Sequence, residues 1–176
     1  MDYQALEEHI KDSVMEEQAK LGFRKEVIRL YYPVGMLNNL FGTACDAEEM
    51  QQALAGFADF AKERLGEVTI THKKDRFCLL LPEETSIYVH EHKKENEFIH
   101  QLVNLIASHE TDMEQVKKLF EQQQFPSVVE QTTGGEFDTV IHFTQGDDRY
   151  YYCFKDEGFH ITYHRFLPAD YKDLGV

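Results

Sequence analysis

The chain has 176 residues, and 32 Asp and Glu against 18 Lys and Arg give it a formal net charge of −14. A surface this acidic repels nucleic-acid phosphates and anionic membranes, so neither is expected as a partner. A basic protein partner or a small ligand remains compatible with it. The hydrophobic content of 42% with 12% aromatic residues excludes a disordered chain, and the length suits one domain with its own core.

The cysteines and the first residues indicate the compartment. Cys45, Cys78 and Cys153 are odd in number and form no CxxC pair, so no zinc knuckle or dithiol motif is present. The N-terminal segment is acidic and amphipathic, unlike a signal peptide, and no apolar run has the length of a membrane span. We therefore expect a cytoplasmic protein with reduced thiols, and no motif requires a cofactor.

Helical spacing of apolar residues dominates the chain up to about residue 125. It predicts helices at about 2–20, 36–42, 47–65, 97–108 and 111–123. Asp46 is a clear N-cap, because the acidic residues that follow it suit the positive end of a helix dipole. The segments 26–32 and 82–92 fit either a helix or another structure, and both alternatives stay open.

Alternating and β-branched residues predict strands in two places. A hairpin is expected at 68–81 around a turn at Lys73–Asp75, and four strands are expected at 128–132, 137–144, 149–155 and 159–166. The predicted fold is α+β: N-terminal helices and a small β-hairpin packed on a C-terminal antiparallel sheet of about four strands. We expect a single domain over 1–176, with a helical part at about 1–125 and a sheet part at about 126–168.

The C-terminal residues also carry a resemblance. The pattern EFD-x-V-I-x-F, then Tyr152-Cys153-Phe154, then EG-x-H-x-x-YHRF-x-P-x-DY, is similar to a family of small uncharacterised bacterial proteins known as a domain of unknown function. The segments RLYYP at 29–33 and VHEH at 89–92 are similar too. This resemblance implies a cytosolic bacterial protein and supplies no catalytic residue.

Three histidines in the predicted sheet, His142, His160 and His164, suggest a zinc site. Strand geometry argues against it, because positions four apart are separated by about 13 Å. That separation is too large for His160 and His164 to share an ion with Zn–N distances of about 2.0–2.1 Å. The remaining question is whether His142 lies on the same face as either of them.

The loop after the third strand of this sheet decides the question. A three-residue Asp-Glu-Gly loop at 156–158 pairs Phe154 with His160 and puts His142 on the opposite face. A two-residue Glu-Gly turn would reverse the parity and bring His142 to the face of His164. We favour the three-residue loop, because Glu-Gly is a weak hairpin signal.

This register leaves one aromatic–histidine face that is either covered by a second layer or partly open to a ligand or peptide. Its residues are Tyr150, Tyr152, Phe154, His160 and His164, with Tyr163 and Arg165 behind them. The candidate binding residues are Tyr150, Tyr152, His160, Tyr163, His164 and Arg165.

His90 and His92 are weaker metal candidates. In a strand their side chains share a face about 6.6 Å apart, whereas in a helix about 200° separates them and co-ligation fails. No metal is expected, and no nucleophile elbow or phosphate loop occurs.

The leading hypothesis is a non-enzymatic cytoplasmic binding protein of acidic character, whose partner contacts the aromatic–histidine face or an acidic helical surface. The alternative is a small-molecule or metal-dependent enzyme that uses His164 with His160 or His142, together with Tyr163 and Arg165.

Overall fold

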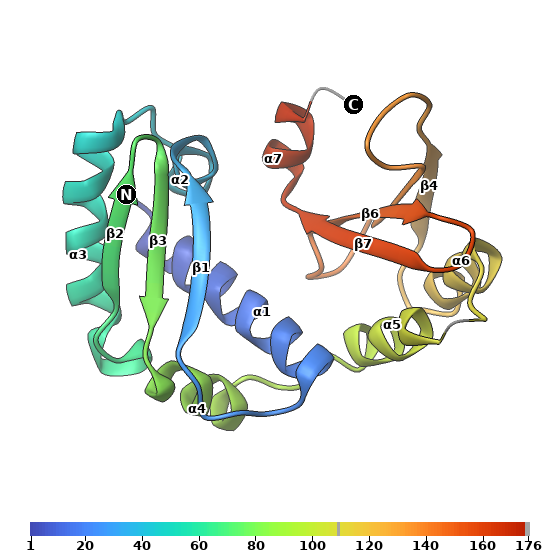
Figure 1. Ribbon diagram of the computed structural model, residues 1–176, viewed down its shortest axis with the longest axis horizontal. Helices are drawn as coiled ribbons and strands as arrows, with labels where there is room; N and C mark the ends of the chain where they lie inside the picture. Colours follow the sequence, from blue (N-terminus) through green and yellow to red (C-terminus); the bar gives the residue numbers. More distant parts are fainter. Residues whose placement is uncertain (109, 175–176) are drawn as a thin grey trace. The chain divides into compact units, whose positions relative to one another are not determined.

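The structure is a computed structural model that describes residues 1–108 and 110–174 (Figure 1). The chain divides into two compact units, Met1–Asn96 and Glu97–Val176. The described residues form seven helices and two antiparallel sheets, one of three strands and one of four. These elements confirm the α+β class, the hairpin in the first part of the chain and the four C-terminal strands.

The N-terminal unit is a three-stranded sheet with helices on one of its faces. Its elements are α1 (Tyr3–Leu21), β1 (Ile28–Pro33), α2 (Val34–Phe41), α3 (Ala47–Leu65), β2 (Thr69–Lys73), β3 (Arg76–Leu81) and α4 (Glu83–His92). The two undecided segments thus become a strand and a helix. Asp46 caps α3 as predicted, and it forms a reciprocal capping box with Glu49.

The strands of this sheet run in the order β1-β3-β2, all antiparallel. Tyr32, Phe77 and His72 lie side by side across them and point to the helical side. There the ring of His9 on α1 meets Tyr32 with 5.7 Å between ring centroids. Figure 1 shows α1 crossing behind the strands. The alternate residues of each strand therefore point away from the helices.

The C-terminal unit contains a four-stranded sheet in the order β4-β5-β6-β7. Its elements are α5 (Glu97–Ala107), α6 (Met113–Glu121), β4 (Ser127–Gln131), β5 (Thr139–Phe143), β6 (Tyr151–Asp156), β7 (Ile161–Phe166) and α7 (Pro168–Asp173). Phe98 from α5 and Phe120 from α6 pack edge-on against Tyr152, with centroid distances of 5.7 and 5.3 Å. These two helices therefore cover one face of the sheet.

The predicted pairing of β6 with β7 is wrong. Phe154 lies opposite Tyr163 instead of His160, and Cys153 lies opposite His164. The connecting loop has four residues, 157–160, because the Asp156 carboxylate accepts a hydrogen bond from the N–H of Gly158 at 2.8 Å. This local bond starts the turn one residue later than predicted, and Gly158 accommodates it with a φ of +83°.

Candidate functional site

The predicted aromatic–histidine face does not exist as one surface. Tyr152 and Phe154 are fully buried under α5 and α6, and Tyr150 is 5% exposed. The corrected register places Tyr163 and Arg165 on the same side as Tyr152, while His164 projects from the opposite side. The structure therefore brings together four of the six candidate residues, Tyr150, Tyr152, Tyr163 and Arg165, and separates His160 and His164 from them.

The four residues that do converge pack on one another: Tyr150 and Tyr152 both bind Asp148, and the Tyr163 ring stacks on that of Tyr152 with 6.4 Å between centroids. The hydroxyl of Tyr152 donates to Asp148 Oδ2 at 2.6 Å, and the backbone N–H of Tyr150 donates to Asp148 Oδ1 at 3.0 Å. The guanidinium of Arg165 lies 4.4 Å from the centre of the Tyr150 ring. Burial, and then the negative charge of Asp148, raise the pKa of Tyr152. Tyr152 is thus a neutral, buried donor that holds the loop before β6.

The three sheet histidines have separate partners. His142 packs on Tyr151 at 4.2 Å, His160 Nε2 lies 2.9 Å from Glu157, and the ring of His164 lies 5.8 Å from that of Phe137. The four-residue loop has the same effect on β7 as the two-residue turn considered above, so His142 and His164 do lie on one face of the sheet. Within residues 1–108 and 110–174, no three His, Cys, Asp or Glu side chains are grouped as metal ligands would be.

His90 and His92 lie on helix α4, so the strand geometry that co-ligation needs is not present there. His90 stacks on Phe23 at 4.0 Å, and His92 stacks on Tyr88 at 4.3 Å. Each imidazole thus belongs to a different aromatic pair.

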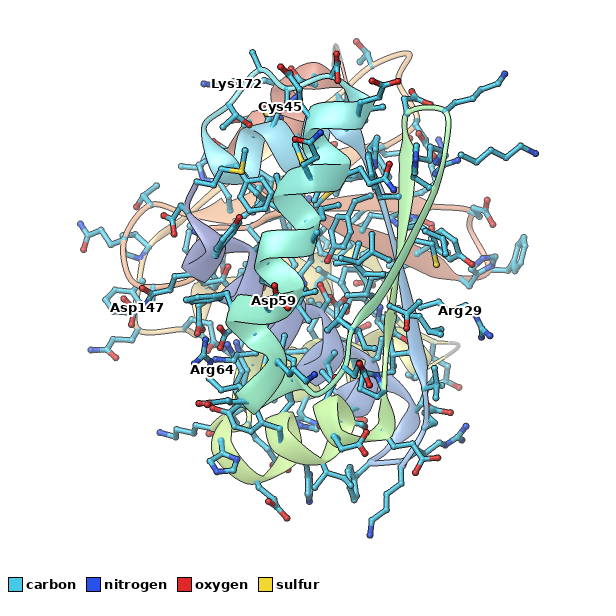
Figure 2. All side chains as sticks on the ribbon, turned by 90° about the vertical axis from the view of Figure 1, so that its left-hand side faces the viewer. Arg29, Cys45, Asp59, Arg64, Asp147 and Lys172 are labelled. Atoms are coloured by element: carbon cyan, nitrogen blue, oxygen red, sulfur yellow. The ribbon has the colours of Figure 1, made fainter. Side chains whose placement is uncertain are left out.

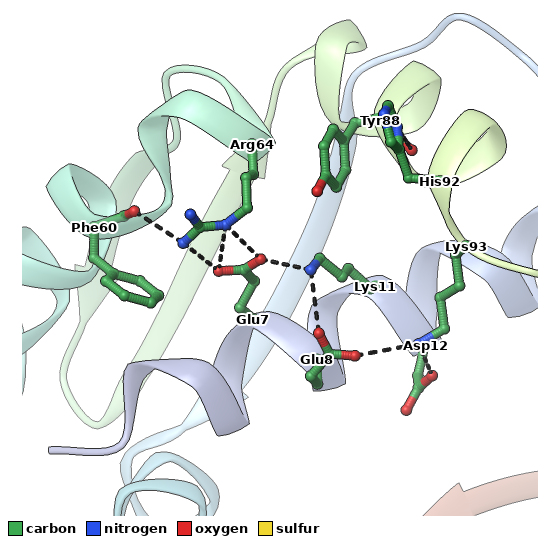
Figure 3. A network of polar contacts seen from close by, with 9 residues as sticks. All are labelled: Glu7, Glu8, Lys11, Asp12, Phe60, Arg64, Tyr88, His92 and Lys93. Atoms are coloured by element: carbon green, nitrogen blue, oxygen red, sulfur yellow. Dashed lines mark hydrogen bonds and ion pairs between the residues drawn. The ribbon is translucent and has the colours of Figure 1, made fainter.

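An ion-pair network joins α1 to α3 and to the residue after α4 (Figure 3). Arg64 binds the buried carboxylate of Glu7, and Lys11 bridges Glu7 at 2.6 Å to Glu8 at 3.1 Å. Lys93 reaches Asp12 at 2.6 Å. Because these charges satisfy one another, the network fixes the helical layer and offers no unpaired group to a ligand.

The outward face of the N-terminal sheet carries basic side chains and no acidic ones. Its three rows, each read across β1, β3 and β2, are Arg29–Leu80–Thr69, Tyr31–Cys78–Thr71 and Pro33–Arg76–Lys73. None of the residues in these strands is Asp or Glu, although the chain contains 32. The cationic sheet face, as we call these nine residues, is therefore a positive surface on an acidic protein.

The cations of this face are available to a ligand. Arg29, Lys73 and Arg76 are exposed, and among the described residues none of the three forms an ion pair. Figure 2 shows the Arg29 side chain pointing outward, away from α3. An open groove of about 540 Å³ runs over one end of the cationic sheet face. Five residues of this face line it, Tyr31, Thr71, Lys73, Arg76 and Cys78, together with His72 and Phe77, whose side chains point to the helical side.

Sequence reasoning missed this face, because it assigned Lys73 only to the turn of the predicted hairpin. One signal was present: residues 27–45 contain no Asp or Glu, and neither do residues 76–82. Which side chains share a face depends on the pairing of β1 with β3, whose first residues lie 48 positions apart. That pairing cannot be read from either segment alone.

The chain belongs to the family described as "Domain of unknown function, E. rectale Gene description (DUF3877)", whose match covers residues 3–175. This confirms the resemblance to an uncharacterised bacterial family. No curated protein and no solved structure shows significant similarity to the chain. Among the described residues, no helix is both long and apolar enough to cross a membrane.

Proposed function

We propose that this is a non-enzymatic binding protein that holds a small anionic ligand on the cationic sheet face. The observation that carries the proposal is the grouping of Arg29, Lys73 and Arg76, without a carboxylate, on one open face of a chain with net charge −14. Charge-assisted hydrogen bonds from guanidinium and ammonium groups are the strong ones in anion recognition.

The net charge favours a small anion over a polyanion. Screening at physiological salt limits electrostatic interactions to about 8 Å, so a ligand that fits the groove responds mainly to the cations around it. A long polyanion would extend past this face toward acidic surface and be repelled there. The groove volume of about 540 Å³ also lies within the range of small-molecule sites, about 300–1,000 Å³.

We also propose a cytoplasmic location. Cys45, Cys78 and Cys153 are all free thiols, which suits a reducing compartment. The enzymatic alternative has less support. Burial raises the pKa of Cys153 to about 12, so its thiol next to His164 is a poor nucleophile at neutral pH.

Thermal-shift and calorimetric titration of the full chain with inorganic phosphate, pyrophosphate, citrate and AMP, at low and high salt, tests the binding function. We expect at least one of these anions to bind at low salt, and high salt to weaken it. The double variant Lys73→Glu/Arg76→Glu should abolish this binding. Arg24→Glu/Lys25→Glu, which reverses two exposed cations in the loop before β1, is the control matched in charge.

Two results would contradict the proposal. The first is that none of the four anions binds at low salt. The second is that Arg24→Glu/Lys25→Glu weakens binding as much as Lys73→Glu/Arg76→Glu does, which would mean that only the overall charge matters.

A further inference from the structure

We infer that the ligand of the cationic sheet face is a mononucleotide, with its base stacked on Tyr31 and its phosphate held by Arg76 and Lys73. This inference rests on the proposed function and adds the chemical class of the ligand. The observation behind it is an exposed aromatic ring in the middle row of a face whose two outer rows carry the cations.

Tyr31 is placed to act as a stacking platform. It is 60% exposed, although the adjacent Tyr32 is 3% exposed on the helical side of the same strand. Among the described residues, no aromatic ring stacks on Tyr31. An aromatic face open to water gains free energy when a flat ring covers it, and every nucleobase presents such a ring.

The spacing of the rows matches a ring joined to an anionic group. Arg76 and Lys73 lie opposite each other in the row next to the one that holds Tyr31. Two residues along a strand span about 6.6 Å and neighbouring strands lie about 4.8 Å apart, so the backbone of Arg76, one strand away, is about 8 Å from that of Tyr31, and that of Lys73, two strands away, is about 12 Å from it. The long side chains of both residues leave one short linker to be bridged between a ring on Tyr31 and a phosphate. A ribose is a linker of this kind between a base and its 5′-phosphate. The hydroxyl of Thr71, which also lines the groove, adds a neutral hydrogen-bonding group there.

The face favours a mononucleotide over a nucleic-acid strand. Single-strand binding surfaces stack successive bases on several aromatic side chains along a basic groove. Tyr31 is the one aromatic residue among the nine of the cationic sheet face. One ring next to one pair of cations suits one base with one phosphate.

The experiment compares AMP with ribose 5-phosphate by calorimetric titration of the full chain. The two ligands share the sugar and the phosphate, and they differ in the base. We expect AMP to bind about tenfold more tightly, which is the usual contribution of one stacked base. Tyr31→Ala should remove this difference and leave the affinity for ribose 5-phosphate unchanged, whereas Tyr31→Phe should retain it. Phe159→Ala, at a residue that is 72% exposed on the β6–β7 loop, is the matched control.

The outcomes separate this inference from the function on which it rests. If ribose 5-phosphate binds and Lys73→Glu/Arg76→Glu abolishes that binding, but AMP binds no more tightly, the proposed function stands and the stacking inference is overturned. If Tyr31→Ala weakens both ligands equally, the inference is overturned as well. Tighter binding of a short single-stranded oligonucleotide than of AMP would reject the mononucleotide class. Failure of all the anions to bind would remove the proposed function itself.

Discussion

Arg64 on α3 donates two hydrogen bonds to the carboxylate of Glu7 on α1, from Nε to Oε1 at 2.8 Å and from Nη2 to Oε2 at 2.8 Å. The Glu7 side chain is only 4% exposed and that of Arg64 is 35% exposed, so the carboxylate is buried while the guanidinium side reaches water. Burial by itself would raise the pKa of Glu7, but hydrogen bonds from Arg64 and Lys11 outweigh it and hold the pKa below its ordinary value. The ionised carboxylate is therefore part of the folded helical layer.

Glu7→Gln should lower the free energy of unfolding by about 2 kcal/mol, because it removes the charge that satisfies two cations at a buried position. Urea unfolding followed by circular dichroism measures this loss. Glu8→Gln is the matched control on the same helix. The Glu8 side chain is 46% exposed and pairs with Lys11 and Lys93 at the surface, so the loss in Glu8→Gln should be about 0–1 kcal/mol. Equal losses in the two variants would contradict the role given to Glu7.

The same contact predicts how stability changes in acid. The pKa of Glu7 is lower in the folded state than its ordinary value of 4.5, so folding favours the ionised form. Its contribution is fully present above the unfolded pKa and is lost as the pH falls through the folded pKa. The difference in unfolding free energy between the wild type and Glu7→Gln should therefore shrink between about pH 7 and about pH 3. A difference that stays constant over this interval would show that the pKa is not lowered.

The three thiols should differ in reactivity. Cys153 is fully buried and burial raises its pKa to about 12, whereas Cys45 and Cys78 are partly exposed. Since the thiolate is the reactive form, iodoacetamide at neutral pH should label Cys45 and Cys78 in the folded protein and leave Cys153 unlabelled. Peptide mass spectrometry identifies the labelled cysteines. Labelling of all three cysteines after denaturation is the control. Labelling of Cys153 in the folded protein at the rate of Cys78 would contradict its burial.

The register of β6 and β7 can be tested with a new disulfide. Cys153 and His164 are directly opposed, and opposed positions on one sheet face have Cβ atoms about 4.5–5.5 Å apart. Under mild oxidation, His164→Cys should form a disulfide with Cys153, detected by intact mass before and after reduction. Ile161→Cys, whose side chain lies on the other face, should not. The three-residue loop would instead place Cys153 opposite Ile161, so a disulfide in the Ile161 variant alone would restore that register.

Local chemistry and the β2–β3 hairpin were predictable from the sequence, but the register of β6 with β7 and the pairing of β1 with β3 were not. Asp46 caps α3 as predicted, because a cap depends on residues within three positions of itself. Asp112 caps α6 in the same way. Residues 28–33 and 83–92 could not be assigned, since their hydrophobic patterns fit two structures and tertiary packing decides between them.

The prediction of the aromatic–histidine face as a binding site failed for a related reason. One hydrogen bond from Gly158 to the side chain of Asp156 lengthens the β6–β7 loop, and this single change sends His164 to the face opposite Tyr152. The cationic sheet face depends on pairing between β1 and β3, which no local pattern specifies. The predicted aromatic–histidine face and the cationic sheet face also differ in exposure: Tyr152 of the former is 0% exposed, and Tyr31 of the latter is 60% exposed.

The cationic sheet face gives the N-terminal unit a permanent electric dipole. Its positive end is the outward side of the sheet, and its negative end lies behind it, where α1 and α3 carry more acidic than basic residues. A negatively charged ligand that diffuses toward this unit experiences a torque before it makes any contact, so the encounter begins with the sheet turned toward the ligand. The division of charge between the sheet and the helices therefore sets the orientation in which the ligand approaches this unit, and this orientation affects the rate of association.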